Sequence, residues 1–395
     1  MAAESIEIAK DLEIGKELTI EAKHLGEMLT AIAKQGYELV GPTVREGAIV
    51  YDHLNSVEDL PRGWTDDQSA GKYRLNRRPD RAFFGYNLGP HSWKKFLHPA
   101  VHCLWKAKRN GNGFQIVPQS PETQKYALIG VRACELHAIA VLDKVFAGGP
   151  YVDPEYKARR ANVFIACANC TQAGGTCFCA SMKTGPKATS GYDLALTEVL
   201  EGANHYFVVA VGSQRGAEVM AAVPHRDASE RDRETADRIV AEASSHMGRS
   251  IDTSGLKDLL YRNYENAHWD NIAKRCMTCA NCTMVCPTCF CTTVEDTTDL
   301  PGEQAERWRK WDSCFAMDFS YIHGGSVRMT PRSRYRQWMT HKLAAWIDQF
   351  GESGCVGCGR CITWCPAGID ITEEARAIRE SEPVAVGTRW KRGVA

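Results

Sequence analysis

Two cysteine-rich stretches with one shared spacing constrain this chain more than any other feature. Each follows the pattern C-x2-C-x2-C-x3-C-P, as CMTCANCTMVCP at residues 276–287 (comb one) and as CVGCGRCITWCP at residues 355–366 (comb two). Three cysteines at this spacing can wrap three corners of a [4Fe–4S] cube, while the changed spacing before Cys-Pro directs the fourth thiolate elsewhere. In two-cluster ferredoxins that fourth cysteine ligates the other cluster. The two combs are therefore expected to be neighbours in space.

This crossed arrangement predicts two clusters. We expect the first on Cys276, Cys279, Cys282 and Cys365, and the second on Cys355, Cys358, Cys361 and Cys286. Zinc is the alternative, but zinc sites usually pair two C-x2-C units, and a third cysteine followed by Cys-Pro fits them poorly. The long stretch between the combs contains predicted helices, which favours the helical variety of dicluster domain over a compact ferredoxin.

The composition places the chain in a reducing compartment. Seventeen cysteines in 395 residues form an odd set, and residues 1–23 alternate charges without the apolar core of a secretory signal. We therefore expect a cytoplasmic protein whose cysteines bind metal. No apolar run reaches the length of a membrane span. The formal net charge is zero, which argues against nucleic acid as the main partner.

The N-terminal part is predicted to be an α/β domain. Residues 16–110 favour short strands, with a hairpin around the REG turn of residues 38–54 and a long polar loop or surface excursion at residues 56–78. From residue 124 strands alternate with helices, beginning with a buried strand at Tyr126–Val131, so parallel pairs are expected. Functional groups lie at the carboxyl ends of such strands.

A charged helix and a polar connection at residues 225–255 suggest a domain boundary. We expect an α+β protein, with an N-terminal α/β domain at residues 1–245 and a mostly helical, ferredoxin-like dicluster domain at residues 246–395. Helices are predicted at residues 255–275, 303–318, 331–351 and in the final ITEEARAIRES segment.

Five further cysteines lie near predicted strand ends. They are Cys134, in GVRACELHA, and Cys167, Cys170, Cys177 and Cys179, in CANCTQAGGTCFC. Together they could supply four ligands to a third cluster, and the glycines of QAGG would let the backbone approach it. The alternative is that some of them pack as small apolar side chains. The pattern alone does not choose four ligands among the five.

Three cysteines after comb one stay unassigned. Cys289, Cys291 and Cys314 could ligate a further group, donate S–H to cluster sulfides, or simply pack in the core. The basic stretch at residues 307–342 is either a solvated helix face, a source of cations that raise cluster potentials, or a docking site for an acidic partner. The dinucleotide, phosphate-loop and G-x-S-x-G fingerprints are absent, so no flavin, nicotinamide or nucleotide site and no catalytic residue is predicted.

Several phrases together resemble one family. They are DLPRGWTDDQSAGKYRL, GPHSWKKFLHP, GVRACELHAI, CFCASMKTGP, GYDLAL, CANCTMVCPTCFC, WDSCF and CVGCGRCITWCP. From about residue 35 to about residue 375 the chain is similar to the iron–sulfur subunit family that includes the β subunits of cytoplasmic [NiFe] sulfhydrogenases and their counterparts in anaerobic sulfite reductases. The family's recurrent cysteines fall on both combs and on Cys134, Cys170, Cys177 and Cys179. The resemblance thus implies a third [4Fe–4S] cluster on these four and leaves Cys167 as the extra.

The resemblance also implies a function. Such proteins relay electrons between a catalytic partner and a flavin-containing diaphorase subunit that handles NAD(P)H. We expect the catalytic partner to be a soluble [NiFe] hydrogenase. The same relay in a sirohaem sulfite reductase is the alternative. A self-contained enzyme with an open cluster coordination site is a further alternative, and CPTCFC and Cys314 are its best support.

Overall fold

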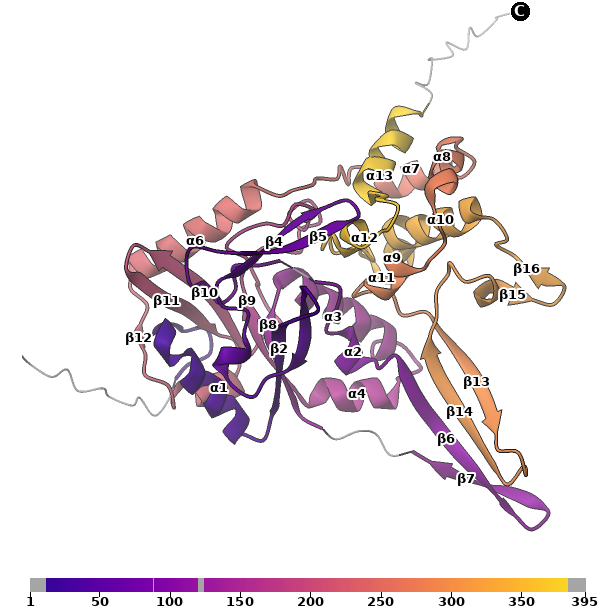
Figure 1. The fold of residues 1–395 in the computed structure, drawn as a ribbon, viewed down its shortest axis with the longest axis horizontal. Coiled ribbons are helices and arrows are strands. Elements are labelled where there is room, and N and C mark those ends of the chain that lie inside the picture. Colours follow the sequence, from indigo (N-terminus) through magenta and orange to yellow (C-terminus); the bar gives the residue numbers. More distant parts are fainter. Residues whose placement is uncertain (1–11, 88, 120–123, 383–395) are drawn as a thin grey trace, which may run out of the picture.

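An eight-stranded mixed sheet organises the N-terminal part of the molecule (Figure 1). The computed structural model describes residues 12–87, 89–119 and 124–382, so the N-terminal segment through residue 11, where no secretory signal is expected, lies outside it. In spatial order the strands are β12 (Arg226–Asp227), β1 (Glu17–Glu21), β11 (Asn204–Val211), β10 (Leu194–Glu201), β9 (Val163–Ala168), β8 (Tyr126–Val131), β2 (Glu38–Arg45) and β3 (Ala48–His53).

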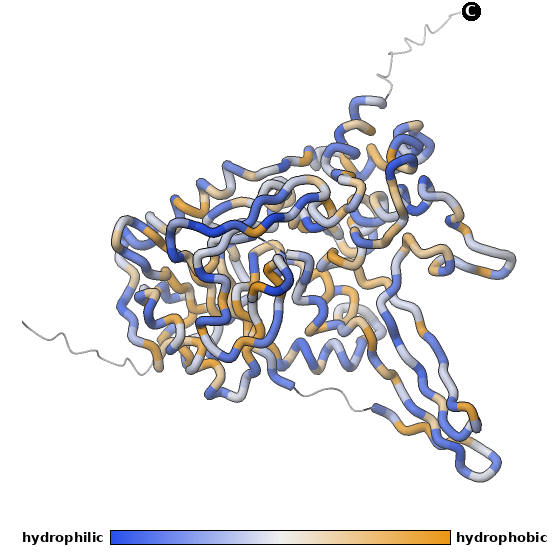
Figure 2. Tube along the Cα trace, in the orientation of Figure 1, coloured by the Kyte–Doolittle hydropathy of each residue, from blue (hydrophilic) through white to orange (hydrophobic). Residues whose placement is uncertain are grey.

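The centre of this sheet is parallel and buried on both faces. Strands β10, β9, β8 and β2 pair in parallel, whereas β2 and β3 form the antiparallel hairpin expected at residues 38–54. Along β8, Ala127 and Ile129 pack on one face and Leu128 on the other, and Figure 2 shows hydrophobic residues gathered along the central strands. Parallel sheets need such two-sided burial. The strand predicted at Tyr126–Val131 and the parallel pairing are therefore confirmed.

Helices cover both faces of the sheet. The first face carries η1 (Ala22–His24), α1 (Leu25–Lys34) and α5 (Gln214–Met220), and the second carries α2 (Lys94–Leu97), α3 (Ala133–Phe146) and α4 (Pro154–Ala161). Helix α6 (Glu230–Ser245) packs on β10 and β11 and is the charged helix expected in residues 225–255. Its N-cap Ser229 accepts a hydrogen bond from the backbone of Asp232, whose carboxylate accepts one from the backbone of Ser229.

The polar segment at residues 56–78 forms a hairpin, not a loop. After η2 (Val57–Asp59), strands β4 (Trp64–Ser69) and β5 (Lys72–Arg77) pair antiparallel, and the backbone N–H of Gly71 in their turn donates to the carbonyl of Ile362, 3.1 Å away. This segment is mostly hydrophilic (Figure 2), so its strands lack the apolar alternation that would predict them. The expected excursion over a surface is confirmed, because the turn reaches comb two.

The helix expected at residues 303–318 is wrong. Residues 304–311 form β14 (Gln304–Trp311), which lies between β13 (Thr292–Thr298) and β6 (Val101–Asn110) in a four-stranded antiparallel sheet completed by β7 (Gly113–Pro118). Pairing with a strand from much earlier in the chain overrides the local charge pattern, which had suggested a helix. Figure 1 shows this sheet projecting from the body as an arm.

The remaining C-terminal elements are helical. They are α7 (Leu256–Arg262), α8 (His268–Arg275), α9 (Asn281–Met284), α10 (Pro331–Thr340), the π-helical turn η4 (His341–Ala345), α11 (Trp346–Phe350), α12 (Arg360–Thr363) and α13 (Ile371–Glu380), with η3 (Asp318–Ser320), β15 (Tyr321–Ile322) and β16 (Gly325–Ser326) between them. Helices predicted at residues 255–275, 331–351 and 371–381 are present, the first two interrupted. Trp269, Trp338 and Ile378 lie in their shared core.

A buried ion pair joins the two parts. Arg360, on α12, donates to Glu135, on α3, over 2.5 Å, and both side chains are almost completely buried. The guanidinium also donates to the carbonyls of Gly89 and His91. Tyr51 donates its hydroxyl to the same carboxylate. Each charge is thus held by several partners, which a buried pair requires to offset its desolvation.

Removing one partner should destabilise the protein. We expect Arg360→Met to cost about 3–5 kcal/mol, because it leaves the Glu135 charge buried without its cation. Thermal unfolding of the anaerobically purified variant measures the loss. The double variant Arg360→Met/Glu135→Leu should recover part of the stability, and a double variant less stable than Arg360→Met would contradict this account.

Candidate metal centres

Comb one and the last cysteine of comb two line the same cavity. Cys276 follows α8, Thr278 and Ala280 take left-handed conformations (φ 51° and 67°), and Cys282 lies in α9. These reversals turn the chain tightly around one point. The cavity is lined by Cys276, Cys279, Cys282 and Cys365, with Phe315, Tyr335, Trp338 and Ile369 among its apolar neighbours. The four ligands predicted for the first cluster therefore lie together.

This cavity lies close to the molecular surface. The side chain of Cys279 is exposed, as is 66% of Met277. Phe315 and Trp338 close the inner side and are buried. A group held here would stand between an apolar wall and solvent.

Comb two turns around a second, deeper centre. Gly357 and Gly359 have positive φ (66° and 75°), and α12 begins directly after them. Burial raises the pKa of Cys361, and the neighbouring thiols of Cys355, Cys358 and Cys286 raise it further. That mutual influence places comb two beside the last cysteine of comb one, as the crossed arrangement predicts.

A buried lysine accompanies this second centre. The ammonium of Lys342 donates to Cys286 Sγ (3.2 Å), to Thr288 Oγ1 (3.0 Å) and to the carbonyl of Gly354 (3.3 Å). A hydrogen bond from the Cys289 thiol, together with the Lys342 charge, holds the pKa of Cys286 well below its usual value. The site therefore favours a thiolate at Cys286, the form in which cysteine binds metal.

The third group of thiols lies at the carboxyl end of the sheet. Cys134 opens α3 directly after β8, and Cys170, Cys177 and Cys179 occupy the loops after β9. Burial raises the pKa of Cys134, and the thiols of Cys179, Cys358 and Cys170 add to the shift. Cys167 instead lies on β9 within the apolar core of the sheet. The structure thus separates Cys167 from the four that the family resemblance selects.

The glycines of QAGG allow the chain to fold closely here. A Cβ on Gly174 would lie 3.1 Å from Cys177 Sγ, and one on Gly175 would lie 2.0 Å from the carbonyl oxygen of Gln68. Only a residue without a side chain fits either position. The expected close approach of the backbone is therefore present.

The third group and comb two are in direct contact. The backbone N–H of Phe178 donates to the carbonyl of Gly357 (2.9 Å), and Cys134, Cys179 and Cys358 belong to one buried cluster. Three groups of thiols thus follow one another, from the sheet edge through comb two to comb one at the surface. Along the described chain no three His, Cys, Asp or Glu side chains are arranged to hold a single metal ion.

The unassigned cysteines lie next to comb two's centre. Cys289 hydrogen-bonds to Cys286, and Cys291 hydrogen-bonds to Cys314. A second buried lysine, Lys94 on α2, donates to the carbonyl of Cys289. No local pattern indicates the role of either lysine, since both stand in ordinary-looking basic segments and only the fold buries them.

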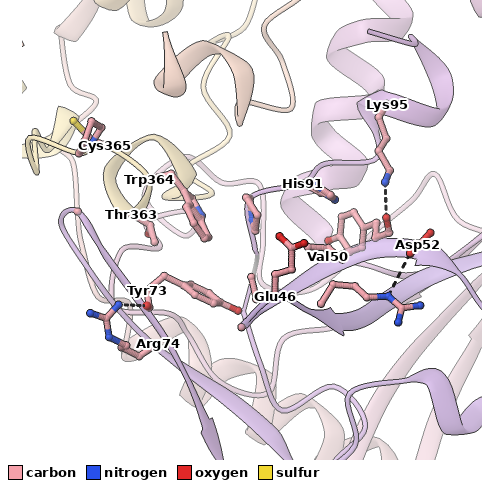
Figure 3. Close-up of a pocket in the computed structure, with 17 residues that line it drawn as sticks. Glu46, Val50, Asp52, Tyr73, Arg74, His91, Lys95, Thr363, Trp364 and Cys365 are labelled. Carbon is pink, nitrogen blue, oxygen red and sulfur yellow. Dashed lines mark hydrogen bonds and ion pairs between the residues drawn. The ribbon is translucent and has the colours of Figure 1, made fainter. Parts of the chain in front are cut away.

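A solvent-open cavity of about 830 Å³ lies between the β2–β3 and β4–β5 hairpins and comb two (Figure 3). The rings of Tyr73 and Trp364 face each other across it with centroids 5.1 Å apart. Arg74, Lys95 and Cys365 also line it. The cavity therefore brings solvent beside the last cysteine of comb two.

Comparisons with known proteins agree with this geometry. Residues 275–369, which include both combs, match a family described as a 4Fe-4S dicluster domain. The chain is thus an α+β protein with a C-terminal dicluster domain, and such a domain implies two [4Fe–4S] clusters. It is also 33% identical over 364 residues (91% of this chain and 98% of the relative) to sulfhydrogenase 2 subunit beta of Pyrococcus furiosus.

The chain belongs to the family of sulfhydrogenase β subunits. No solved structure matches it. Within the described residues, no helix is both long and apolar enough to cross a membrane.

The contact between Gly357 and the third group generates a prediction. In Gly357→Ala the new Cβ would lie 2.7 Å from Cα of Cys179, so the loops must separate. We expect a lower thermal midpoint and a loss of iron per chain. Gly351→Ala is the matched control, because Gly351 has φ 76° and nothing within 4 Å of its Cβ position. It should add only backbone strain, about 1 kcal/mol, and equal effects of the two changes would contradict the assignment.

Proposed function

We propose that this protein is a cytoplasmic, non-catalytic electron-transfer subunit of a soluble [NiFe] hydrogenase complex. Three [4Fe–4S] clusters would carry single electrons between a subunit that binds flavin and NAD(P)H and the subunits that hold the [NiFe] site. The observation that carries the proposal is the continuous succession of three thiol groups from the sheet edge to the surface. The name of the Pyrococcus furiosus relative supports the hydrogenase partner over a sirohaem sulfite reductase.

The proposed ligand sets follow the three groups. They are Cys276, Cys279, Cys282 and Cys365 for cluster one, Cys355, Cys358, Cys361 and Cys286 for cluster two, and Cys134, Cys170, Cys177 and Cys179 for the third cluster. The shared cavity of the first set and the mutual influence of thiols within the other two support these assignments. When bound, the clusters supply one-electron redox chemistry.

The protein's own residues position and insulate this relay. Phe315, Tyr335 and Trp338 exclude water from the inner side of the comb one cavity. Arg360 and Glu135 hold comb two against α3, which begins next to Cys134. Exposed Cys279 places cluster one where another protein of the complex can approach it. The buried third cluster would then exchange electrons with the surface through cluster two.

We also propose a division of the chain at residue 245, where α6 ends. On this division residues 1–245 carry the third cluster, and residues 246–395 carry the helical dicluster domain. The two parts are interlocked, because β14 from the second pairs with β6 from the first.

Iron and acid-labile sulfide counting tests the proposal. Anaerobically purified protein should contain about twelve iron atoms per chain, since three cubanes hold four each. The double variant Cys177→Ser/Cys179→Ser should retain about eight, whereas Cys167→Ser, which changes a buried cysteine of the sheet core, should match the wild type.

Other outcomes would count against the proposal. About eight iron atoms in the wild type would remove the third cluster, and zinc without sulfide would remove all three. Steady substrate turnover by the purified chain with a chemical electron donor would favour a self-contained enzyme over a relay.

A further inference from the structure

Two buried lysines face the second thiol centre without a carboxylate partner. Lys342 is 5% exposed and Lys94 is 3% exposed. Among the ion pairs of the described residues, neither ammonium contacts an Asp or Glu. Lys94 donates to the carbonyl of Cys289 (2.9 Å) and lies 3.9 Å from the centre of the Trp311 ring. Their hydrogen bonds are satisfied, but their charges lack a carboxylate counterion.

Such an arrangement is costly unless anions lie nearby. Moving an ammonium from water into a protein interior costs several kcal/mol even after relaxation. Two ammonium groups in one region also repel each other, so the compensating charge must be close to both. The groups available are sulfurs: Lys342 lies 3.2 Å from Cys286 Sγ, and Cys289 is bonded to that same thiol.

The backbone at Lys342 is unusual as well. Residues His341–Ala345 form a π-helical turn between α10 and α11. Such turns are rare within α-helices and occur frequently at functional sites. Here the turn carries Lys342 into the interior, where its ammonium reaches the thiol, while the flanking helical residues Trp338 and Trp346 remain in core positions.

We propose that Lys342, assisted by Lys94, raises the reduction potential of cluster two. This inference rests on the proposed function, because it takes Cys286 as a ligand of that cluster. Reduction adds one electron, and hence one negative charge, to the cluster. A fixed positive charge in contact with a ligand sulfur stabilises the reduced form more than the oxidised form, and low local dielectric strengthens the effect.

The arrangement has a consequence for electron flow. Cluster two stands between the third group and comb one, so its potential decides where an electron rests along the relay. A raised potential makes the middle cluster the place where a single electron is held. The ammonium charges are already present before reduction, so the step needs one electron and no added proton.

Redox titration monitored by electron paramagnetic resonance tests the proposal on the full chain. In Lys342→Met one cluster should become harder to reduce by at least tenfold in its reduced-to-oxidised ratio, which corresponds to a midpoint lower by about 59 mV. The other midpoints should stay in place. Lys342→Arg, which keeps the charge, should restore most of the shift. Lys94→Met should move the same cluster in the same direction by a smaller amount.

Lys274→Met is the matched control. Lys274 lies two residues before comb one but is exposed, so solvent screens its charge and its removal should leave all midpoints unchanged. Unmoved potentials in Lys342→Met and Lys94→Met with full iron content would overturn this inference alone. If Lys342→Met loses iron, Lys94→Met decides, because Lys94 touches no ligand sulfur. A wild-type chain without iron–sulfur clusters would instead overturn the proposed function.

Discussion

The structure depends on one buried contact between two parts of the chain. Arg360, within comb two, and Glu135, at the start of α3, form an ion pair that solvent does not reach. Around this pair the loops of the third thiol group and comb two approach so closely that glycine is required at residue 357. The positions of three cysteine groups are thereby coupled. A relay of electrons requires such coupling, because transfer between centres depends steeply on their separation.

Charge is distributed unevenly through this protein. Its formal net charge is zero, and most ion pairs lie at the surface, where each contributes little. The fully buried cations Arg360, Lys342 and Lys94 all lie beside cysteines of comb two or its neighbours. Such cations would offset the negative charge that thiolates and iron–sulfur clusters bring into a low-dielectric interior. Electrostatics, more than shape, distinguishes the middle centre from the other two.

The sequence predicted those features that repeat or alternate. The comb spacing predicted that Cys365 would lie with comb one, and the structure places it there. The apolar run at Tyr126–Val131 predicted a buried strand, since two-sided burial leaves that signature. Strand β14 was missed because its alternation is masked by charged residues, and its partner β6 lies far away in sequence. Lys342 and Lys94 were missed for a related reason: burial of a lysine is a property of the fold, and no local pattern records it.

The arm formed by β6, β7, β13 and β14 has a consequence for how the protein is assembled. The chain leaves comb one at Cys291, enters β13 and β14, pairs with a strand made much earlier in synthesis, and only then returns to comb two. The dicluster domain cannot close before the N-terminal part has been synthesised and has presented β6. A fragment starting at residue 246 would expose the edge of β14, and unpaired edges invite aggregation. In this family the ferredoxin-like domain is therefore built into the rest of the protein and is not a detachable module.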